Sequence, residues 1–235
     1  MTKKKNLIPP SCASCELVRP KRICISPEGI GSKGCPTLVG KEALAEAQKE
    51  YEDPEVREFA RQASIQEGEC YANRHQRPYV MQPTKPRIVE IGEFARKMGY
   101  KRLGLAFCIG LRKEAKVVEG VFKAYGFEVV SVICKAGRIS KEKIGIKEKE
   151  KIFQGSDETM CNPIFQAKSL NKAGTEFNVL LGLCVGHDSL FFKYAEAPTT
   201  VLAVKDRVTG HNPLAAIYLS DTYYQKISNP LISKG

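Results

Sequence analysis

Residues 102–134 read RLGLAFCIGLRKEAKVVEGVFKAYGFEVVSVIC, and in this stretch two apolar runs flank an amphipathic segment. The two runs, residues 102–108 and 127–134, are short and rich in apolar or β-branched side chains, as buried strands are. Between them, residues 113–126 place apolar side chains at helical spacing. The pattern predicts two parallel strands joined by a right-handed helical crossover.

The same alternation continues on both sides of this unit. We expect further helices over residues 88–100, 164–174, 189–195 and 214–224, and further strands over residues 178–184 and 199–205. Apolar strands that alternate with helices predict an α/β fold with a doubly wound, mostly parallel, Rossmann-like sheet. No G-x-G-x-x-G motif follows the first strand, so the sequence lacks a dinucleotide-binding fingerprint.

Two further regions precede this α/β domain, which we place at residues 87–235. Residues 1–40 hold four cysteines and little periodicity, so we interpret them as a small cysteine-rich module that needs a metal to become ordered. Residues 41–86 are interpreted as a helical segment and linker. Asp53 and Pro54 are typical of the N-cap and first position of a helix there.

The composition describes an ordinary globular protein, with 235 residues of which 43% are hydrophobic and 27% charged. The longest near-apolar stretch, residues 179–186, is far shorter than the roughly 20 residues of a membrane span. The start, MTKKKNLIPP, has no apolar segment typical of a secretory signal. We therefore expect a cytoplasmic protein without a membrane partner.

Nine cysteines, an odd number, do not suit a disulfide framework in a reducing compartment; they are metal ligands, nucleophiles or buried fillers. The net charge of +11 is less informative. Residues 1–41 carry eight Lys or Arg and two Glu, and residues 141–151 mix both signs. No aromatic interleaving accompanies the charge, so nucleic acid is not favoured as a partner.

Four cysteines fall at the same edge of the predicted sheet. Cys108, Cys134 and Cys184 each end a predicted strand, and Cys161 directly precedes Asn162, the expected N-cap of a helix. Strand carboxyl ends and helix amino ends share one edge of a parallel sheet, where ligands bind. We call Cys108, Cys134, Cys161 and Cys184 the crest cysteines. They are 26, 27 and 23 residues apart, about one strand–helix unit each.

The crest cysteines are interpreted as ligands of a [4Fe–4S] cluster. Zinc is the alternative metal, but structural zinc sites favour short C-x-x-C turns over thiols from separate loops. Each cysteine taken alone is equally well explained as a small buried hydrophobic residue. Convergence of four on one edge favours a ligand role.

The crest also carries polar side chains. His187 and His211 each follow a strand and precede a helix, and imidazole at such an edge can ligate a metal or transfer protons. Arg207 suits an anionic substrate group or a surface ion pair with Asp206. We take His187, Asp188, Arg207 and His211 as candidate catalytic residues, although N-capping alone explains Asp188 and likewise Asn212.

A second set of four cysteines lies in the N-terminal module. Cys12, Cys15, Cys24 and Cys35 form a C-x2-C-x8-C-x10-C pattern, in which the first pair can clamp a metal and the later two can close the site. Zinc and a second iron–sulfur cluster both suit four thiolates. A redox-active C-x-x-C or idle thiols are the alternatives. The remaining cysteine, Cys70, is interpreted as structural.

Several motifs resemble an uncharacterised prokaryotic family known as a domain of unknown function and as predicted cysteine-rich metal-binding proteins. They are CNPIFQA (161–167), LGLCVGHDSLF (182–191), VKDRV (204–208) and HNPLAA (211–216), after the N-terminal C-x-x-C. The resemblance implies that all eight cysteines of the two sets belong to the family's cysteine set. It implies no reaction.

The sequence thus predicts an iron–sulfur redox enzyme, an oxidoreductase or desulfidase-like enzyme, acting on a small anionic or sulfur-containing substrate. The alternative is a non-catalytic electron carrier or sensor that binds zinc or closed clusters. A third reading is an RNA sulfur-modification enzyme that uses the basic N-terminal arm. The expected partner is a small-molecule substrate or a redox partner protein, and nothing in the sequence indicates an oligomeric state.

Overall fold

The computed structural model describes residues 8–229, and the chain divides into two compact units. The first unit ends at Ile65 and the second begins at Gln66. Residues 1–7 and 230–235 lie outside the described part, and with them three of the eight basic residues that the sequence carries in residues 1–41.

Loops, short helical turns and two longer helices make up the first unit. Its elements are η1 (Cys12–Ser14), η2 (Arg19–Lys21), α1 (Pro36–Val39), α2 (Lys41–Glu50) and most of α3 (Pro54–Glu69). The four elements before α3 contain no buried residue, as the weak periodicity indicates. Asp53 accepts hydrogen bonds from the backbone N–H groups of Glu55 (2.8 Å) and Val56 (3.1 Å), which makes it the N-cap that the Asp-Pro step predicts.

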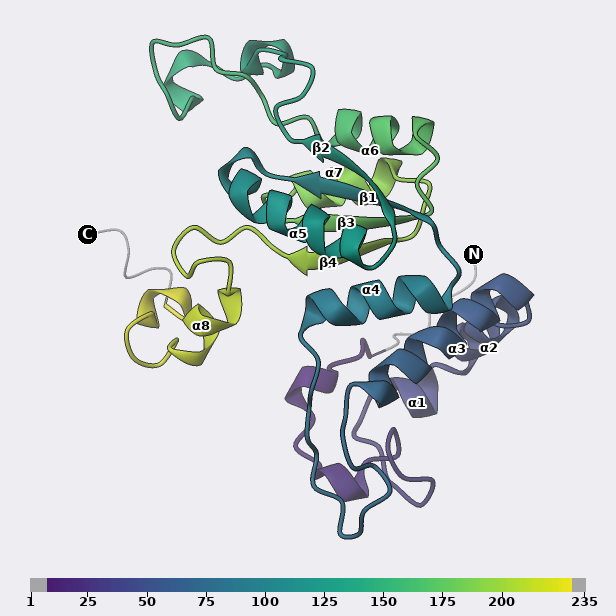
Figure 1. The fold of residues 1–235 in the computed structure, drawn as a ribbon. Helices are drawn as coiled ribbons and strands as arrows, with labels where there is room; N and C mark the ends of the chain where they lie inside the picture. The colour runs from purple at the N-terminus through teal and green to yellow at the C-terminus, as the bar shows by residue number, and fades with distance from the viewer. Residues whose placement is uncertain (1–7, 230–235) are drawn as a thin grey trace, which may run out of the picture. The chain divides into compact units, whose positions relative to one another are not determined.

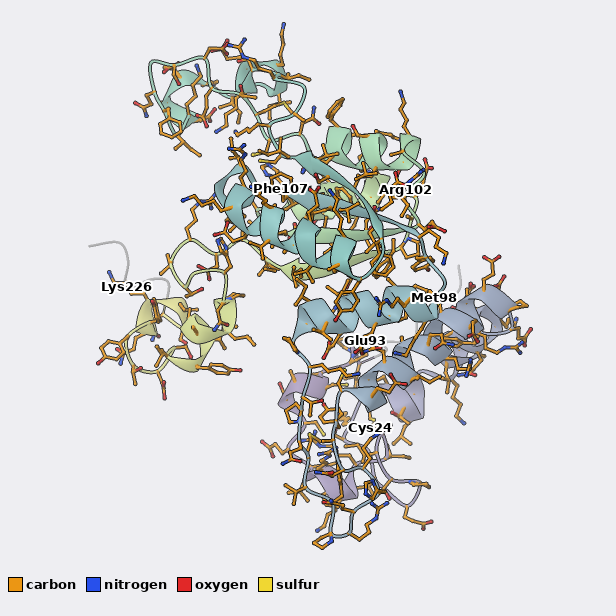
Figure 2. The ribbon with its side chains drawn as sticks, in the orientation of Figure 1. Cys24, Glu93, Met98, Arg102, Phe107 and Lys226 are labelled. Carbon is orange, nitrogen blue, oxygen red and sulfur yellow. The ribbon has the colours of Figure 1, made fainter. Side chains whose placement is uncertain are left out.

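The second unit is built on a parallel sheet of four strands, in the order β2-β1-β3-β4 (Figure 1). The strands are β1 (Arg102–Phe107), β2 (Glu128–Ile133), β3 (Phe177–Leu181) and β4 (Thr199–Ala203). Figure 2 labels Arg102 and Phe107, the two ends of β1. The predicted α/β class with a parallel sheet is confirmed.

Helices cover both faces of this sheet. After α3, the helices of the second unit are α4 (Arg87–Lys97), α5 (Arg112–Ala124), α6 (Pro163–Lys172), α7 (His187–Tyr194) and α8 (Pro213–Tyr218), and its short turns are η3 (Ile109–Leu111), η4 (Lys141–Ile144), η5 (Glu148–Glu150) and η6 (Gln225–Ile227). The helix α5 lies on one face, while α6 and α7 pack together on the other (Figure 1). In the order β2-β1-β3-β4, the chain adds β2 on one side of β1 and then β3 and β4 on the other. The strand order therefore reverses between β1 and β3, which is the point where open α/β sheets bind ligands.

The core lies between the two central strands and their helices. Leu103 and Leu105 of β1, Val179 of β3, Phe122 of α5 and Phe191 of α7 have no accessible side-chain surface. Burial of this apolar area is the main favourable contribution to folding. A fully inaccessible polar residue, Asn178, accepts a hydrogen bond from Thr175 Oγ1 at 2.8 Å.

The structure corrects two predictions at helix starts and one at a helix end. The helix α7 begins at His187 with Gly186 (φ 82°) as N-cap, so Asp188 lies inside the first turn and is not the cap. Asn212 precedes α8, but its side chain accepts no capping hydrogen bond, and α8 ends at Tyr218 rather than at residue 224. Asn162 does cap α6, since its Oδ1 accepts the N–H of Phe165 at 3.0 Å.

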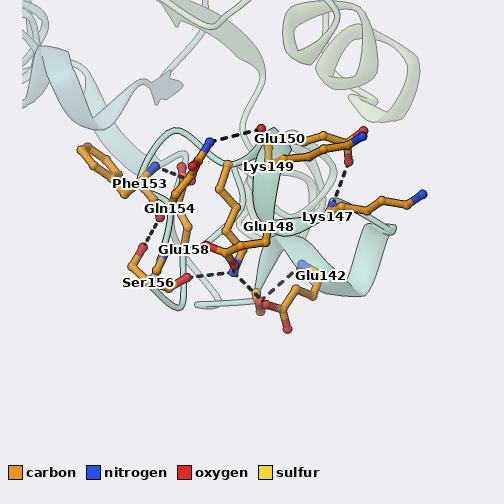
Figure 3. Close-up of polar contacts among 12 residues, drawn as sticks. Glu142, Lys147, Glu148, Lys149, Glu150, Phe153, Gln154, Ser156 and Glu158 are labelled. Carbon is orange, nitrogen blue, oxygen red and sulfur yellow. Dashed lines mark hydrogen bonds and ion pairs between the residues drawn. The ribbon is translucent and has the colours of Figure 1, made fainter.

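An excursion over residues 135–160 links β2 to α6 and is organised by ion pairs (Figure 3). The ammonium group of Lys151, whose side chain is 3% exposed, donates to three oxygens: Glu142 Oε1 (2.8 Å), Glu148 Oε2 (2.8 Å) and the Ser156 carbonyl (2.9 Å). The mixed charges of residues 141–151 therefore form a satisfied network in addition to a hydrated surface.

The helices of residues 8–229 fall short of the length and hydropathy that crossing a membrane requires.

Candidate functional site

The register of the central strands brings the crest together. Phe107, Ile133 and Leu181, the last residues of β1, β2 and β3, are aligned across the sheet. The residues that follow remain paired: the Cys108 N–H donates to the Leu181 carbonyl (3.2 Å), and the Cys134 N–H to the Phe107 carbonyl (2.9 Å). Two thiols from different loops therefore lie side by side at the carboxyl edge.

Three of the four crest thiols are in contact. The Cys134 side chain hydrogen-bonds with Cys108 and with Cys161. Its sulfur also accepts the backbone N–H of Ile109 at 3.3 Å. Cys161 reaches this position because its neighbour Asn162 donates its backbone N–H to the Cys134 carbonyl at 2.8 Å.

Their proton affinities diverge as a result of this contact. Hydrogen bonding to Cys134 lowers the pKa of Cys108 to about 5, assisted by the Gly110 N–H and the Lys205 ammonium. Contact with Cys134 and then with the His187 imidazole lowers the pKa of Cys161 to about 4. The pKa of Cys134 is raised, because its hydrogen bonds to the Cys108 and Cys161 sulfurs, and then its burial, favour the protonated thiol. Cys134 therefore keeps its proton longest, and its neighbours become thiolates first.

Burial differs along the set. Cys108 is 8% exposed and Cys134 is 2% exposed, and both pack in the apolar core cluster with Ala167 and Leu183. These two thiols thus also fill core volume, which is the alternative that the sequence left open. Cys161 and Cys184 are half-buried, so the outer side of the crest is accessible.

Cys184 follows β3 by three residues and has a different partner. Nη2 of Arg207 donates a hydrogen bond to Cys184 Sγ at 3.2 Å. The hydrogen bond to the Cys184 sulfur raises the pKa of the Arg207 guanidinium, because it favours the charged form. Arg207 is thus drawn to the crest, although it does not pair with Asp206.

The other candidate catalytic residues differ in whether they reach a crest thiol. His187 lies against the Cys161 sulfur. His211 has a positive φ of 69°, and its Nδ1 accepts the backbone N–H of Asp206 at 3.1 Å, so its Nε2 carries the proton. The Asp188 carboxylate accepts the N–H of Ser189 at 2.8 Å and has no contact with a crest thiol in the described residues.

Two lysines of the crest were not singled out as site residues from the sequence. Lys205 follows β4 and hydrogen-bonds the Cys108 sulfur, and Lys135 follows β2 and attracts the negative charge of Cys161. Lys135 directly follows Cys134, and Lys205 lies two residues after the end of β4, so both lie at the strand carboxyl ends that singled out the cysteines. Their cationic charge favours thiolates at the crest.

The N-terminal cysteines of the first unit line one cavity of about 140 Å³. Cys12 and Cys24 are exposed, and Cys15 and Cys35 are half-buried. The segments carrying them are held by backbone hydrogen bonds, such as that from the Ile30 N–H to the Lys21 carbonyl at 2.9 Å. The predicted tetrad is therefore gathered around a shared space.

No group of three or more His, Cys, Asp or Glu side chains within residues 8–229 is already arranged to hold a metal ion. The donor sets nevertheless suit a soft metal or an iron–sulfur cluster, since four thiols line the N-terminal cavity and three touch at the crest.

Cys70 has the structural surroundings expected of it. It is 7% exposed and its thiol donates to the Gln66 carbonyl at 3.0 Å. Burial raises the pKa of this thiol, so it is a protonated thiol at neutral pH. Gln66 in turn contacts Glu93 (2.7 Å) and Lys97 (2.5 Å) of α4.

Two solved structures are similar to part of the chain. They are Dph2 from Pyrococcus horikoshii and the same protein with a 4Fe–4S cluster, at 16% and 17% identity and a TM-score of 0.33. The similarity covers 62% and 61% of this chain and 33% of each Dph2 chain, so this chain spans about a third of their length.

Sequence relatives give the family. The uncharacterized protein MJ0455 of Methanocaldococcus jannaschii is 51% identical over 142 residues, which cover 60% of this chain and 70% of that protein. A family model described as a protein of unknown function, DUF1847, matches residues 35–202, from the last N-terminal cysteine to β4. The resemblance read from the motifs is confirmed: the chain belongs to the DUF1847 family of proteins of unknown function.

Proposed function

We propose that the chain is an iron–sulfur metalloprotein, a redox enzyme whose [4Fe–4S] cluster binds at the crest. One observation carries the proposal: the Cys134 thiol contacts both Cys108 and Cys161, so thiols from three separate loops meet at the ligand-binding edge of the sheet. Thiolates are the usual protein ligands of such clusters.

The charges around the crest support the same proposal. Lys205 and Lys135 lie by the sulfurs of Cys108 and Cys161, and Arg207 lies by Cys184. Thiolates bound to iron and sulfide leave a net negative site, and cations or N–H donors around it stabilise that charge and tune its reduction potential. The Ile109 N–H, which donates to Cys134, is one such donor.

A bound cluster would supply single-electron transfer, and the chain's own residues would handle the substrate. His187, beside Cys161, can give or take a proton at the crest. His211, held by Asp206, presents Nε2–H as a second donor. Arg207 can bind an anionic group of the substrate.

For the first unit we propose a metal held by Cys12, Cys15, Cys24 and Cys35, which line the shared cavity. Zinc would order this loop-rich segment, and a second cluster would in addition relay electrons. If all four cysteines of each set bound metal, no coordination position would remain for a substrate. The protein would then be an electron carrier or sensor instead of an enzyme.

Metal and sulfide analysis of the full chain, purified without oxygen, tests the proposal. We expect brown protein with iron and acid-labile sulfide, and Cys134→Ala should lose the crest cluster while it keeps the N-terminal metal. Cys70→Ala is the matched control, because Cys70 is also buried but contacts Gln66 of α3. Colourless protein that contains zinc alone would contradict the iron–sulfur proposal.

A further inference from the structure

Cys184 stands apart from the other crest cysteines. Cys134 contacts Cys108 and Cys161, whereas the Cys184 sulfur accepts a hydrogen bond from Nη2 of Arg207 at 3.2 Å. The turn that carries Cys184 is fixed by its own backbone, because the Cys184 carbonyl accepts the N–H groups of His187 (3.0 Å) and Asp188 (3.2 Å).

Arg207 holds the Cys184 sulfur and is free of carboxylates. The neighbouring Asp206 carboxylate accepts the backbone N–H groups of Val208 (2.9 Å) and Thr209 (3.1 Å) instead. The Arg207 side chain is exposed, and no acidic side chain of residues 8–229 forms an ion pair with it. A guanidinium has five N–H donors, so most of its donor capacity remains for a ligand.

A second cation lies on the same side of the crest. The Lys205 backbone N–H donates to the Leu183 carbonyl at 3.2 Å, one residue before Cys184, and its ammonium group contacts the Cys108 sulfur. The charge of Arg207 also acts on Cys108 and Cys161. An anion bound by Arg207 would therefore lie next to the crest sulfurs.

We infer that Cys184 and Arg207 form an anion-binding subsite beside the cluster instead of completing its ligand set. The cluster is then held by the three thiols in contact, Cys108, Cys134 and Cys161. This inference rests on the proposed function, since it assigns the substrate class of the same site.

The subsite defines the ligand's chemistry. Three protein thiolates leave one iron without a protein ligand, and an open position is what lets a metal site bind substrate. Thiolate sulfur is the soft donor that suits this iron, and a carboxylate suits the planar fork of Arg207. The ligand class is therefore a small molecule that carries both a thiol and a carboxylate.

The first test compares iron and sulfide content of anaerobically purified full-length variants. Cys184→Ala and Cys184→Ser should retain the wild-type content at the crest, whereas Cys134→Ala should lose it. Loss of iron in both Cys184 variants, with circular dichroism unchanged, would overturn the inference and leave the proposed function standing. Wild-type protein without iron and sulfide would overturn both.

The second test titrates the reduced wild-type cluster with 3-mercaptopropionate and with 2-mercaptoethanol, which lacks the carboxylate, followed by electron paramagnetic resonance. The carboxylate should tighten binding about tenfold, as one charge-assisted pair contributes. Arg207→Gln should abolish that preference, and Arg112→Gln, an exposed arginine on α5, should keep it. Equal binding of the two thiols to the wild type would overturn the anion subsite.

Discussion

The backbone N–H of Ile109 donates a hydrogen bond to Sγ of Cys134 at 3.3 Å, so the loop after β1 holds the thiol that ends β2. This bond fixes the central sulfur of the crest, and contact with that sulfur is the largest cause of the lowered pKa of both Cys108 and Cys161. The proton distribution of the metal-free crest therefore depends on Cys134.

Replacing Cys134 by Ala should raise the pKa of Cys161 in metal-free, reduced protein. Alkylation needs the thiolate. With a pKa of about 4, wild-type Cys161 should react with iodoacetamide at a rate that is flat above about pH 6. In the variant the rate should climb with pH across that range, as measured by mass spectrometry of the Cys161 peptide. A flat profile in Cys134→Ala would contradict the contact, and Cys70→Ala should leave the profile unchanged.

The fold could be predicted because each of its determinants is local. The β-branched run before Cys134 and the helical spacing of residues 113–126 both predict the elements that form. The strand ends placed Cys108 and Cys134 on one edge for the same reason. Asn162 followed its short-range capping rule, whereas Asn212, in the same Asn-Pro context, makes no cap.

The partners of the crest thiols could not be predicted, because they depend on side-chain directions set by distant segments. Arg207 has an acidic neighbour, Asp206, yet it reaches Cys184, which lies 23 residues earlier. The contact between Lys205 and Cys108 likewise joins loops that follow β4 and β1. Spacing in the sequence places such residues on one edge without pairing them.

The two Asn-Pro helix starts offer a matched pair for capping. Asn162→Ala removes the hydrogen bond to the Phe165 N–H and should lower the free energy of unfolding by about 1 kcal/mol. Asn212→Ala should change it by only a few tenths of a kcal/mol, because its side chain accepts no capping bond. Urea unfolding measures both. An equal decrease in the free energy of unfolding for both variants would contradict the finding that Asn162 caps its helix and Asn212 does not.

Gln166 of α6 is a fully buried amide beneath the crest. Its Nε2 donates to the carbonyls of Val132 (2.7 Å) and Phe107 (3.2 Å), while its Oε1 has no partner among the described residues. Gln166→Leu removes the unpaired oxygen along with both bonds, so the net loss of stability should be about 1–2 kcal/mol. Gln166→Glu should cost more, because it places a charge against two carbonyls. Urea unfolding should give a lower free energy of unfolding for Gln166→Glu than for Gln166→Leu. The reverse order would contradict the contacts of the Gln166 side chain.

Lys151→Met should loosen the excursion over residues 135–160 without affecting the sheet. The substitution keeps the length of a side chain that is 3% exposed but removes the three donors to Glu142, Glu148 and the Ser156 carbonyl. Hydrogen exchange by mass spectrometry should show faster exchange over residues 141–158 and unchanged protection in β1 and β3. Lys149→Met, an exposed lysine of the same turn, should alter neither.

Removal of metal should affect the first unit more than the sheet. The elements η1, η2, α1 and α2 contain no buried residue, so little apolar burial holds residues 8–50 together, whereas β3 is buried throughout. If the cavity lined by the N-terminal cysteines binds metal, that binding supplies the missing stability. Chelation should then make residues 8–40 susceptible to trypsin while β1 and β3 stay resistant. Cys24→Ser should reproduce this cleavage without chelator. Resistance of residues 8–40 in both experiments would show that their order does not depend on a metal.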